Sequence, residues 1–327
     1  MAHTFPHMSL VRGRAGMGLL VLAMLQMGCG GAKSRSEPPR LLLPARLSGL
    51  LPARTNLALR ADLARMRHTE SYPSIRRMIE GGFERSGSRS HVDIGKILDD
   101  SGEFVAGVSY DASASVPSTV ILLRGAYAPG SLDQLGASYS PPLRTEFLAR
   151  DVWVIAQAAA IKNIRKKLMS RGSAEPVLRV LREKYGFDEA LLCLVAEGTP
   201  DVHRRITQDP LFASVPLFRE GPLSQVFSTF QSMGLRIDID RAVRVQLGFH
   251  VASSALAQAA ANQAGDLVSR YRRNFFVIAL GLRPVFDNAF VYADNGRLSV
   301  KVEVPERDAA AIATRVADLS KLSSRTR

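Results

Sequence analysis

The sequence predicts an α+β fold with antiparallel sheets whose helices pack on one face. Residues 243–251 alternate between apolar and polar side chains, which is typical of an antiparallel strand with one buried and one solvated face. Asn295-Gly296 lies between two alternating stretches, and this dipeptide is a strong hairpin signal. The order of a hairpin followed by a helix recurs along the chain. We therefore expect repeated hairpin-then-helix units arranged in two halves.

The first α+β half is expected over residues 51–172. Its predicted strands are residues 56–61, 103–110, 118–123, 145–148 and 152–155. Asp62 is predicted to cap the first helical stretch, which pauses at Tyr72-Pro73, resumes and ends at Gly81-Gly82. Further helices are expected from Ser131 and over residues 158–169, each of them after a hairpin.

The second α+β half is expected over residues 173–327. Its predicted strands are residues 235–239, 243–251, 290–293 and 298–304, and its predicted helices are residues 174–184, 222–233, 254–272 and 306–319. Gly221-Pro222 is a typical helix start. The repeated units share a pattern but not a sequence, so an internal duplication is a hypothesis. It requires the same strand order in both halves.

An apolar run of 11 residues, 17–27, follows Arg12 and Arg14 near the start of the chain. A membrane-spanning helix needs about 20 apolar residues, so this run is too short to be one. A basic start, a short apolar segment and a small residue, Gly28, are typical of a secretory signal peptide. A buried core helix is the alternative, which the position at the extreme N-terminus disfavours. We expect residues 1–28 to be removed as a signal peptide.

Cys29 is the first residue after this segment. Residues 8–33 resemble the lipobox region of bacterial lipoprotein precursors. The resemblance implies that Cys29 is lipidated and becomes the mature N-terminus, with residues 29–50 forming a flexible tether. Gln26 departs from the leucine that such boxes usually carry three positions before the cysteine. A signal peptide that is cut nearby without lipidation is the alternative, and Met8 is a second candidate for the true start.

The chain is basic, with 43 lysines and arginines against 30 aspartates and glutamates and a formal net charge of +13. Without the signal peptide about 300 residues remain, with a charge of about +11. Such a balance favours anionic neighbours, such as lipid head groups or acidic polysaccharide; a genome that prefers arginine is the alternative. Nucleic acid is not expected as a partner, because the chain is predicted to leave the cytoplasm and has no aromatic stacking platform.

The densest cluster of basic residues lies in and just after the helix predicted over residues 158–169. Its members share one side of that helix, opposite Ile161, Ile164 and Leu168, and they are Lys162, Arg165, Lys166, Lys167 and Arg171. Contact with an anionic surface, such as a membrane or a polyanion, is one interpretation of this cluster. A solvated helix face that also complements the helix C-terminus is the other.

Recurring catalytic patterns are missing from the predicted mature chain. It has neither the H-E-x-x-H zinc motif nor a G-x-S-x-G nucleophile elbow, and its four histidines lie far apart in sequence. Asp238 and Asp240 would share one face of a strand, which predicts a solvated face rather than a pair of catalytic carboxylates. Cys193 lies in a continuous apolar run and is predicted to be a buried small hydrophobe. We expect no catalytic residue, no metal and no cofactor.

The mature part resembles secreted α+β proteins of myxobacteria and planctomycetes. The matching stretches are Leu51-Pro52-Ala53, Leu59–Leu63 and Asp294–Pro305, and the resemblance implies no particular activity. The sequence favours a non-enzymatic envelope lipoprotein that faces the periplasm or the cell surface. It would act as a scaffold or binding module for anionic lipid, polysaccharide or envelope proteins. The alternatives are a carrier of a lipid or other apolar ligand, which an apolar site between sheet and helices would favour, and an envelope hydrolase.

Overall fold

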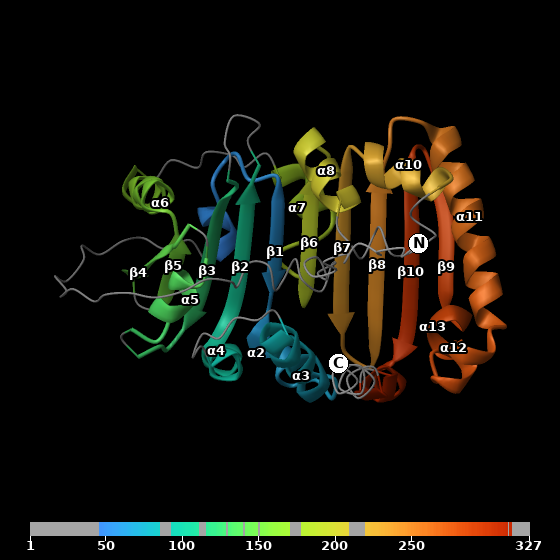
Figure 1. Ribbon diagram of the computed structural model, residues 1–327, viewed down its shortest axis with the longest axis horizontal. Coiled ribbons are helices and arrows are strands. Elements are labelled where there is room, and N and C mark those ends of the chain that lie inside the picture. The colour runs from blue at the N-terminus through green and yellow to red at the C-terminus, as the bar shows by residue number, and fades with distance from the viewer. Residues whose placement is uncertain are drawn as a thin grey trace, which may run out of the picture.

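The computed structural model describes residues 46–85, 93–110, 116–128, 130–139, 141–149, 151–170, 178–208, 220–312 and 314–315. Its centre is a single ten-stranded sheet in which every neighbouring pair is antiparallel, with helices packed against it (Figure 1). The predicted α+β class with antiparallel pairing is confirmed.

The strands are β1 (Leu57–Ala61), β2 (Ser101–Ser109), β3 (Ser118–Gly125), β4 (Arg144–Ala149), β5 (Val152–Ala156), β6 (Leu192–Glu197), β7 (Ser232–Ile239), β8 (Ala242–His250), β9 (Ala289–Asp294) and β10 (Arg297–Pro305). The helices are η2 (Leu47–Leu50), α2 (Leu63–Met66), α3 (Tyr72–Arg85), α4 (Ile94–Asp100), α5 (Asp133–Ala137), α6 (Ala158–Ser170), α7 (Arg179–Lys184), α8 (Pro200–Gln208), α10 (Pro222–Thr229), α11 (Ser254–Arg272), α12 (Phe275–Ala279) and α13 (Arg283–Asp287).

The strand order repeats itself across the middle of the sheet. The ten strands lie in the order β4-β5-β3-β2-β1-β6-β7-β8-β10-β9. From the outer edge to the centre, one half runs β4, β5, β3, β2, β1 and the other runs β9, β10, β8, β7, β6. Each strand of the first half therefore has a counterpart in the second half that comes five strands later in the chain. β1 and β6 pair antiparallel in the middle, with Leu57 opposite Ala196. The duplication hypothesis therefore meets the strand order that it requires, and the two halves share one sheet.

One face of the sheet, called the front face here, is packed against helices of both halves. Leu59 of β1 and Ile121 of β3 belong to its apolar core, as does Leu298 of β10. The helices that cover this core include α5 in the first half and α10 and α11 in the second, which contribute buried residues such as Leu135 and Ala260. Since α5 and α11 each follow the central hairpin of their half, they are counterparts on the same face.

On the opposite face, called the back face here, the described helices lie over the first half and the centre. Leu122 and Val154 pack there against Ile161 and Ile164 of α6. The helices are thus not confined to the one face that the sequence predicts. The reason lies in β3 and β5, where consecutive residues are apolar and buried, because a strand that is apolar on both sides needs cover on both sides.

Local signals identify most of the elements. Asp62 caps α2 as predicted, accepting a hydrogen bond from the backbone N–H of Arg65 at 3.0 Å. Asn295 and Gly296 have φ angles of 44° and 76°, as the tight turn of an Asn-Gly hairpin requires. β6 is the strand that the sequence does not predict, because its residues lack alternation. Cys193 lies in it as a buried free thiol, and burial raises its pKa to about 12, as suits the predicted small hydrophobe.

Candidate functional site

The predicted basic cluster divides over two sides of α6. Lys162, Arg165 and Lys166 are exposed, and Arg165 forms an ion pair with Glu146 of β4 at 2.6 Å. Lys167 instead points toward η2, where its ammonium donates hydrogen bonds to the backbone carbonyls of Gly49, at 2.7 Å, and Leu51, at 3.3 Å. Burial, with a contribution from the charge of Arg182, lowers the pKa of Lys167. This lysine holds the first described residues against the sheet instead of facing an anionic surface.

Two of the residues singled out in the sequence, Cys29 and Arg171, lie outside the described residues. Asp238 and Asp240 both have arginine partners. The carboxylate of Asp238 pairs with Arg236 at 2.5 Å, and that of Asp240 pairs with Arg244. Within the described ranges, no group of three or more histidines, cysteines, aspartates or glutamates is placed to hold a metal ion.

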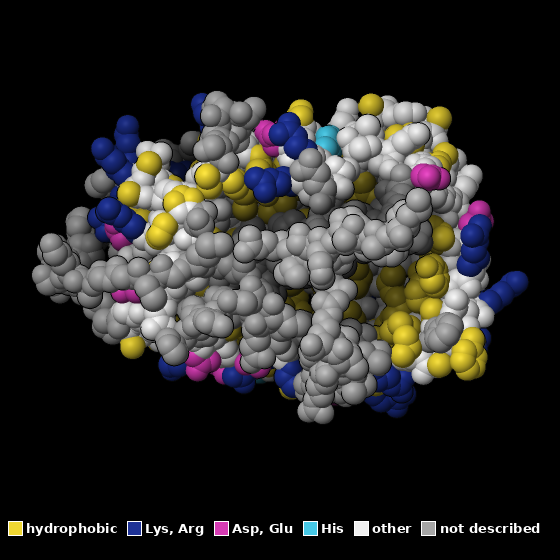
Figure 2. Space-filling model, viewed as in Figure 1, with side chains coloured by type: hydrophobic (Ala, Val, Ile, Leu, Met, Phe, Trp, Pro, Cys, Tyr) yellow, Lys and Arg dark blue, Asp and Glu magenta, His cyan; other side chains and the backbone are white. Residues whose placement is uncertain are grey.

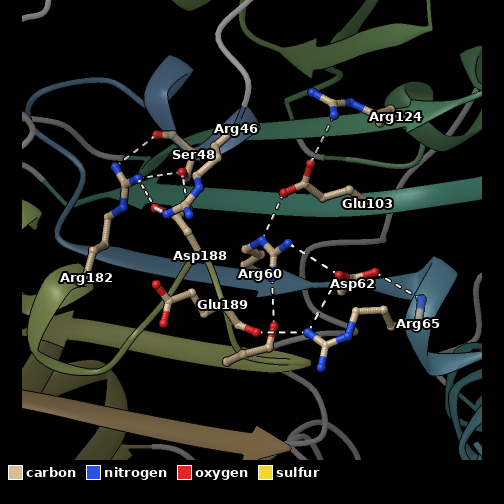
Figure 3. A network of polar contacts seen from close by, with 11 residues as sticks. Arg46, Ser48, Arg60, Asp62, Arg65, Glu103, Arg124, Arg182, Asp188 and Glu189 are labelled. Atoms are coloured by element: carbon tan, nitrogen blue, oxygen red, sulfur yellow. Dashed lines mark hydrogen bonds and ion pairs between the residues drawn. The ribbon is translucent and has the colours of Figure 1, made fainter.

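The most buried polar cluster surrounds Arg60 in the centre of the sheet (Figure 3). Its guanidinium donates to Glu103 of β2 at 2.9 Å and to the backbone carbonyl of Ala190 at 2.7 Å, and it lies 3.6 Å from Asp62. Arg124 approaches Glu103 from β3 at 3.9 Å. Each carboxylate of this cluster faces arginine (Figure 3). The cluster links β1, β2 and the chain that leads into β6.

A second polar group in the same figure fixes η2 to the loop before β6 (Figure 3). Asp188 accepts a hydrogen bond from the hydroxyl of Ser48 and pairs with Arg182 at 2.8 Å and with Arg46 at 3.5 Å. Burial alone would raise the pKa of the Asp188 carboxyl, but these donors outweigh burial and hold the pKa below its ordinary value. The arrangement is structural, since it closes the N-terminal edge of the back-face core.

The front face of the second half differs from that of the first, because the described elements cover its centre only in part. Leu235 of β7 lies opposite Leu247 of β8, which lies opposite Val300 of β10. The next row of the same face holds Ile237, Val245 and Val302. All six side chains are half-buried. We call these six residues the apolar floor.

The matching positions of the first half are closed. β2, β3 and β5 are the counterparts of β7, β8 and β10, and their front-face residues Ala106, Ile121 and Ile155 are fully buried. Trp153 completes that packing with ring-edge contacts to Tyr127 and Phe147. No aromatic residue occupies the floor itself, which is purely aliphatic. Among the described residues, this position of the fold is thus fully buried in the first half and half-buried in the second.

Helices surround the apolar floor on several sides. α10 covers its upper end, where Phe227 packs against Phe249 with ring centroids 4.9 Å apart. α11 runs along β9 and β10 at the outer edge, and α13 contacts β10. Leu63 and Tyr72, of α2 and α3, belong to the apolar cluster that also includes Ile237. Among the described elements, no helix has extensive contact with β7 or β8, so the floor is framed at its margins.

Exposed apolar side chains gather where α11 ends. They are Tyr271, Phe275 and Ile278, and Phe275 is 75 % exposed. Tyr271 stacks on Phe286 of α13 with ring centroids 5.5 Å apart. The neighbouring arginines Arg270, Arg272 and Arg273 are also exposed. Figure 2 shows hydrophobic side chains at the lower right, where α12 and α13 lie, and Lys and Arg along the adjoining edge. Aromatic residues beside cations are typical of surfaces that meet a membrane interface.

Known proteins match this chain at the level of structure. No protein-family model matches the sequence, and no curated protein matches it. Among solved structures, crystal forms I and III of TP0453 are similar at 14 % sequence identity, with TM-scores of 0.42 and 0.45. The matches cover 82 % and 84 % of this chain and 96 % and 99 % of TP0453. No helix in the described part of the chain is long and apolar enough to span a bilayer.

Proposed function

We propose that the protein is a lipoprotein of the cell envelope that acts as a non-enzymatic binding module, with the apolar floor as its binding site for the hydrocarbon chain of a lipid. Cys29 would anchor it to the membrane, and the body would face the periplasm or the cell surface. The observation that carries the proposal is the half-buried aliphatic floor of β7, β8 and β10, framed by helices, at a place where the first half is closed.

The chemistry of the floor selects an apolar ligand. Leu235, Leu247 and Val300 offer no hydrogen-bond donors or acceptors, and the backbone groups of β7 and β8 are used within the sheet. A polar ligand would lose its hydrogen bonds with water there without replacement. A hydrocarbon chain instead gains about 0.8 kcal/mol for each methylene group that leaves water.

The charge and the exposed residues support a location beside a membrane. The positive charge of the mature chain, about +11 once the signal peptide is removed, favours a surface of anionic lipids. Tyr271 and Phe275, at the end of α11, add an apolar surface with arginines beside it. A protein held beside the membrane in this way would have the apolar floor close to the lipids that it is proposed to bind.

The anchor is tested by replacing the predicted acylated residue. We expect the unaltered chain, produced in a bacterial host that processes lipoproteins, to fractionate with membranes and to carry acyl mass on Cys29. Cys29→Ser is expected to move most of the protein to the soluble fraction, because one or more buried chains at about 0.8 kcal/mol per methylene are lost. Intact mass spectrometry and fractionation measure both effects. An unaltered chain that is soluble and unacylated would contradict the anchor.

The apolar floor is tested with a fluorescent fatty acid, cis-parinaric acid, added to the mature chain carrying Cys29→Ser. We expect saturable binding, and Leu247→Glu is expected to weaken it at least tenfold, about 1.4 kcal/mol, because the carboxylate lies where the probe must exclude water. Fluorescence titration measures the dissociation constant.

Gln246→Glu is the matched control, since it places the same charge on the adjacent residue of β8 but on the other face of the sheet. It should change probe affinity by less than twofold. Circular dichroism and thermal unfolding confirm that both variants are folded. Absence of saturable binding to the parent protein, or equal losses in the two variants, would refute the floor as the site. Capture of a protein segment on the floor in place of lipid would favour the scaffold function.

A further inference from the structure

The back face of the second half differs from its counterpart in the first. In the first half, α6 covers apolar residues such as Leu122 and Val154. In the second half, the back-face positions of β7, β8 and β10 carry polar residues, among them Gln246 and Lys301. The ring of Tyr185, which follows α7, lies over the centre of this face. A Cβ atom added at Gly234 would lie 2.4 Å from this ring, so the close approach requires glycine there.

Two cations lie beside the ring of Tyr185. The guanidinium carbon of Arg297 is 5.6 Å from the ring centroid, and the ammonium of Lys184 is 6.0 Å from it. Within the described residues neither cation has a carboxylate within 4 Å, not even Asp294, the register partner of Arg297 on β9. Burial and the charge of Arg297 lower the pKa of Lys184. The two positive charges are therefore held close together, and no described carboxylate pairs with either of them.

Hydroxyl groups and a third cation continue the cluster along β9 and β10. Ser299 is fully buried and lies opposite Tyr292, and the ammonium of Lys301 is 5.4 Å from the ring centroid of Tyr292. Burial would raise the pKa of the Tyr292 phenol, but the nearby side chains of Lys301, Ser299 and Arg297 outweigh burial and lower it. The environment thus favours negative charge at this position.

Two buried nitrogen atoms of the cluster lack hydrogen-bond partners. They are Nε of Arg297 and Nδ1 of His250, and neither has a partner in the described part of the chain. The two residues lie directly opposite each other on β10 and β8, on the same face as Ser299. Buried polar atoms are normally satisfied, and an exception indicates a water molecule or an ion that completes the group.

We propose that Lys184, His250, Tyr292, Arg297, Ser299 and Lys301, the back-face cluster, bind a phosphate-type oxyanion. An oxyanion would neutralise the three cations and accept hydrogen bonds from arginine, lysine and the hydroxyls, and arginine matches phosphate with two parallel bonds. The anion is either free phosphate or the phosphate of a lipid headgroup. This site lies on the face of the sheet opposite the apolar floor and does not depend on it.

Binding is measured by calorimetry on the mature chain carrying Cys29→Ser, with inorganic phosphate at constant ionic strength set by chloride. A second measurement uses vesicles of phosphatidylcholine with and without phosphatidic acid. We expect Arg297→Gln to weaken binding of the phosphate group at least tenfold. Lys301→Gln, at an exposed position that leaves folding unaffected, is expected to weaken it by about threefold or more.

Arg244→Gln is the control, because Arg244 is an exposed cation of the same face whose partner is Asp240. It should change affinity by less than twofold. Saturable binding of inorganic phosphate that Arg297→Gln abolishes supports a site for free phosphate. Binding only to vesicles with phosphatidic acid, with the same dependence on Arg297 and Lys301, supports a headgroup site. Binding of neither probe, or equal losses in all three variants, would overturn the proposal, whatever the result at the apolar floor.

Discussion

Arg60→Met is expected to lower the free energy of unfolding by about 3–5 kcal/mol, the usual cost of removing one partner from a buried ion pair. Arg60 is only 7 % exposed, and its loss leaves the buried carboxylate of Glu103 with Arg124 alone, at 3.9 Å. The backbone carbonyl of Ala190 loses its 2.7 Å donor as well. Urea unfolding followed by circular dichroism measures the change.

Two companion variants identify the cause of this destabilisation. Arg165→Met removes an ion pair with Glu146 whose arginine is 48 % exposed, and it should cost no more than about 1 kcal/mol. The double variant Arg60→Met/Glu103→Leu should recover part of the loss, because no unpaired carboxylate stays buried. A single variant as stable as the parent would show that the Arg60 pair contributes nothing to stability.

Phe230→Ala is expected to cost about 3–5 kcal/mol, as truncation of a fully buried aromatic residue does. Phe230 ends α10 with 0 % exposure and makes ring-edge contacts with His203, at 4.7 Å between centroids, and with Phe249, at 5.9 Å. Its removal opens a cavity between α8, α10 and β8, which close the upper end of the apolar floor. Thermal and urea unfolding measure the loss.

Phe290→Ala provides the comparison for Phe230→Ala. Phe290 of β9 is 65 % exposed, so its truncation should change stability by no more than about 0.5 kcal/mol. Similar losses in both variants would contradict the packing described for α10. A large loss only in Phe290→Ala would indicate that this exposed residue is covered by a second copy of the chain.

Local sequence signals predict the hairpins of this fold well, because their physics is local. The Asn295-Gly296 turn and the Asp62 cap depend on a few neighbouring residues, and both form as expected. Local signals do not predict β6. Its residues around Cys193 are apolar on both faces, and only the pairing with β1 and β7 makes them a strand. The cover of the back face by α6 is equally non-local, although the apolar runs of β3 and β5 carry a signal for it.

The candidate sites depend on tertiary contacts that no local pattern contains. The alternation of residues 243–251 predicts that Val245 and Leu247 face the core, but whether a helix covers them depends on where α11 packs. Lys184 and Arg297 are more than 100 residues apart in the chain, and they meet only because Tyr185 lies across β7 and β8. For Lys167, the sequence pattern correctly predicts the helix that carries it. It does not predict that the ammonium bonds to a backbone carbonyl of η2, which turns the side chain away from solvent.

The pairing of β1 with β6 at the centre of the sheet has a consequence for the origin and synthesis of the chain. A polypeptide of half this length, with the same strand order, could close an equivalent sheet by pairing its β1 with the β1 of a second copy, since antiparallel neighbours are related by a twofold axis and form a self-complementary interface. In the present chain β1 is made about 130 residues before β6. Its inner edge must stay unpaired for that interval, and an exposed edge strand readily pairs with other chains. Fusion of two halves thus replaces a concentration-dependent dimer by one chain, with an edge that needs protection during synthesis.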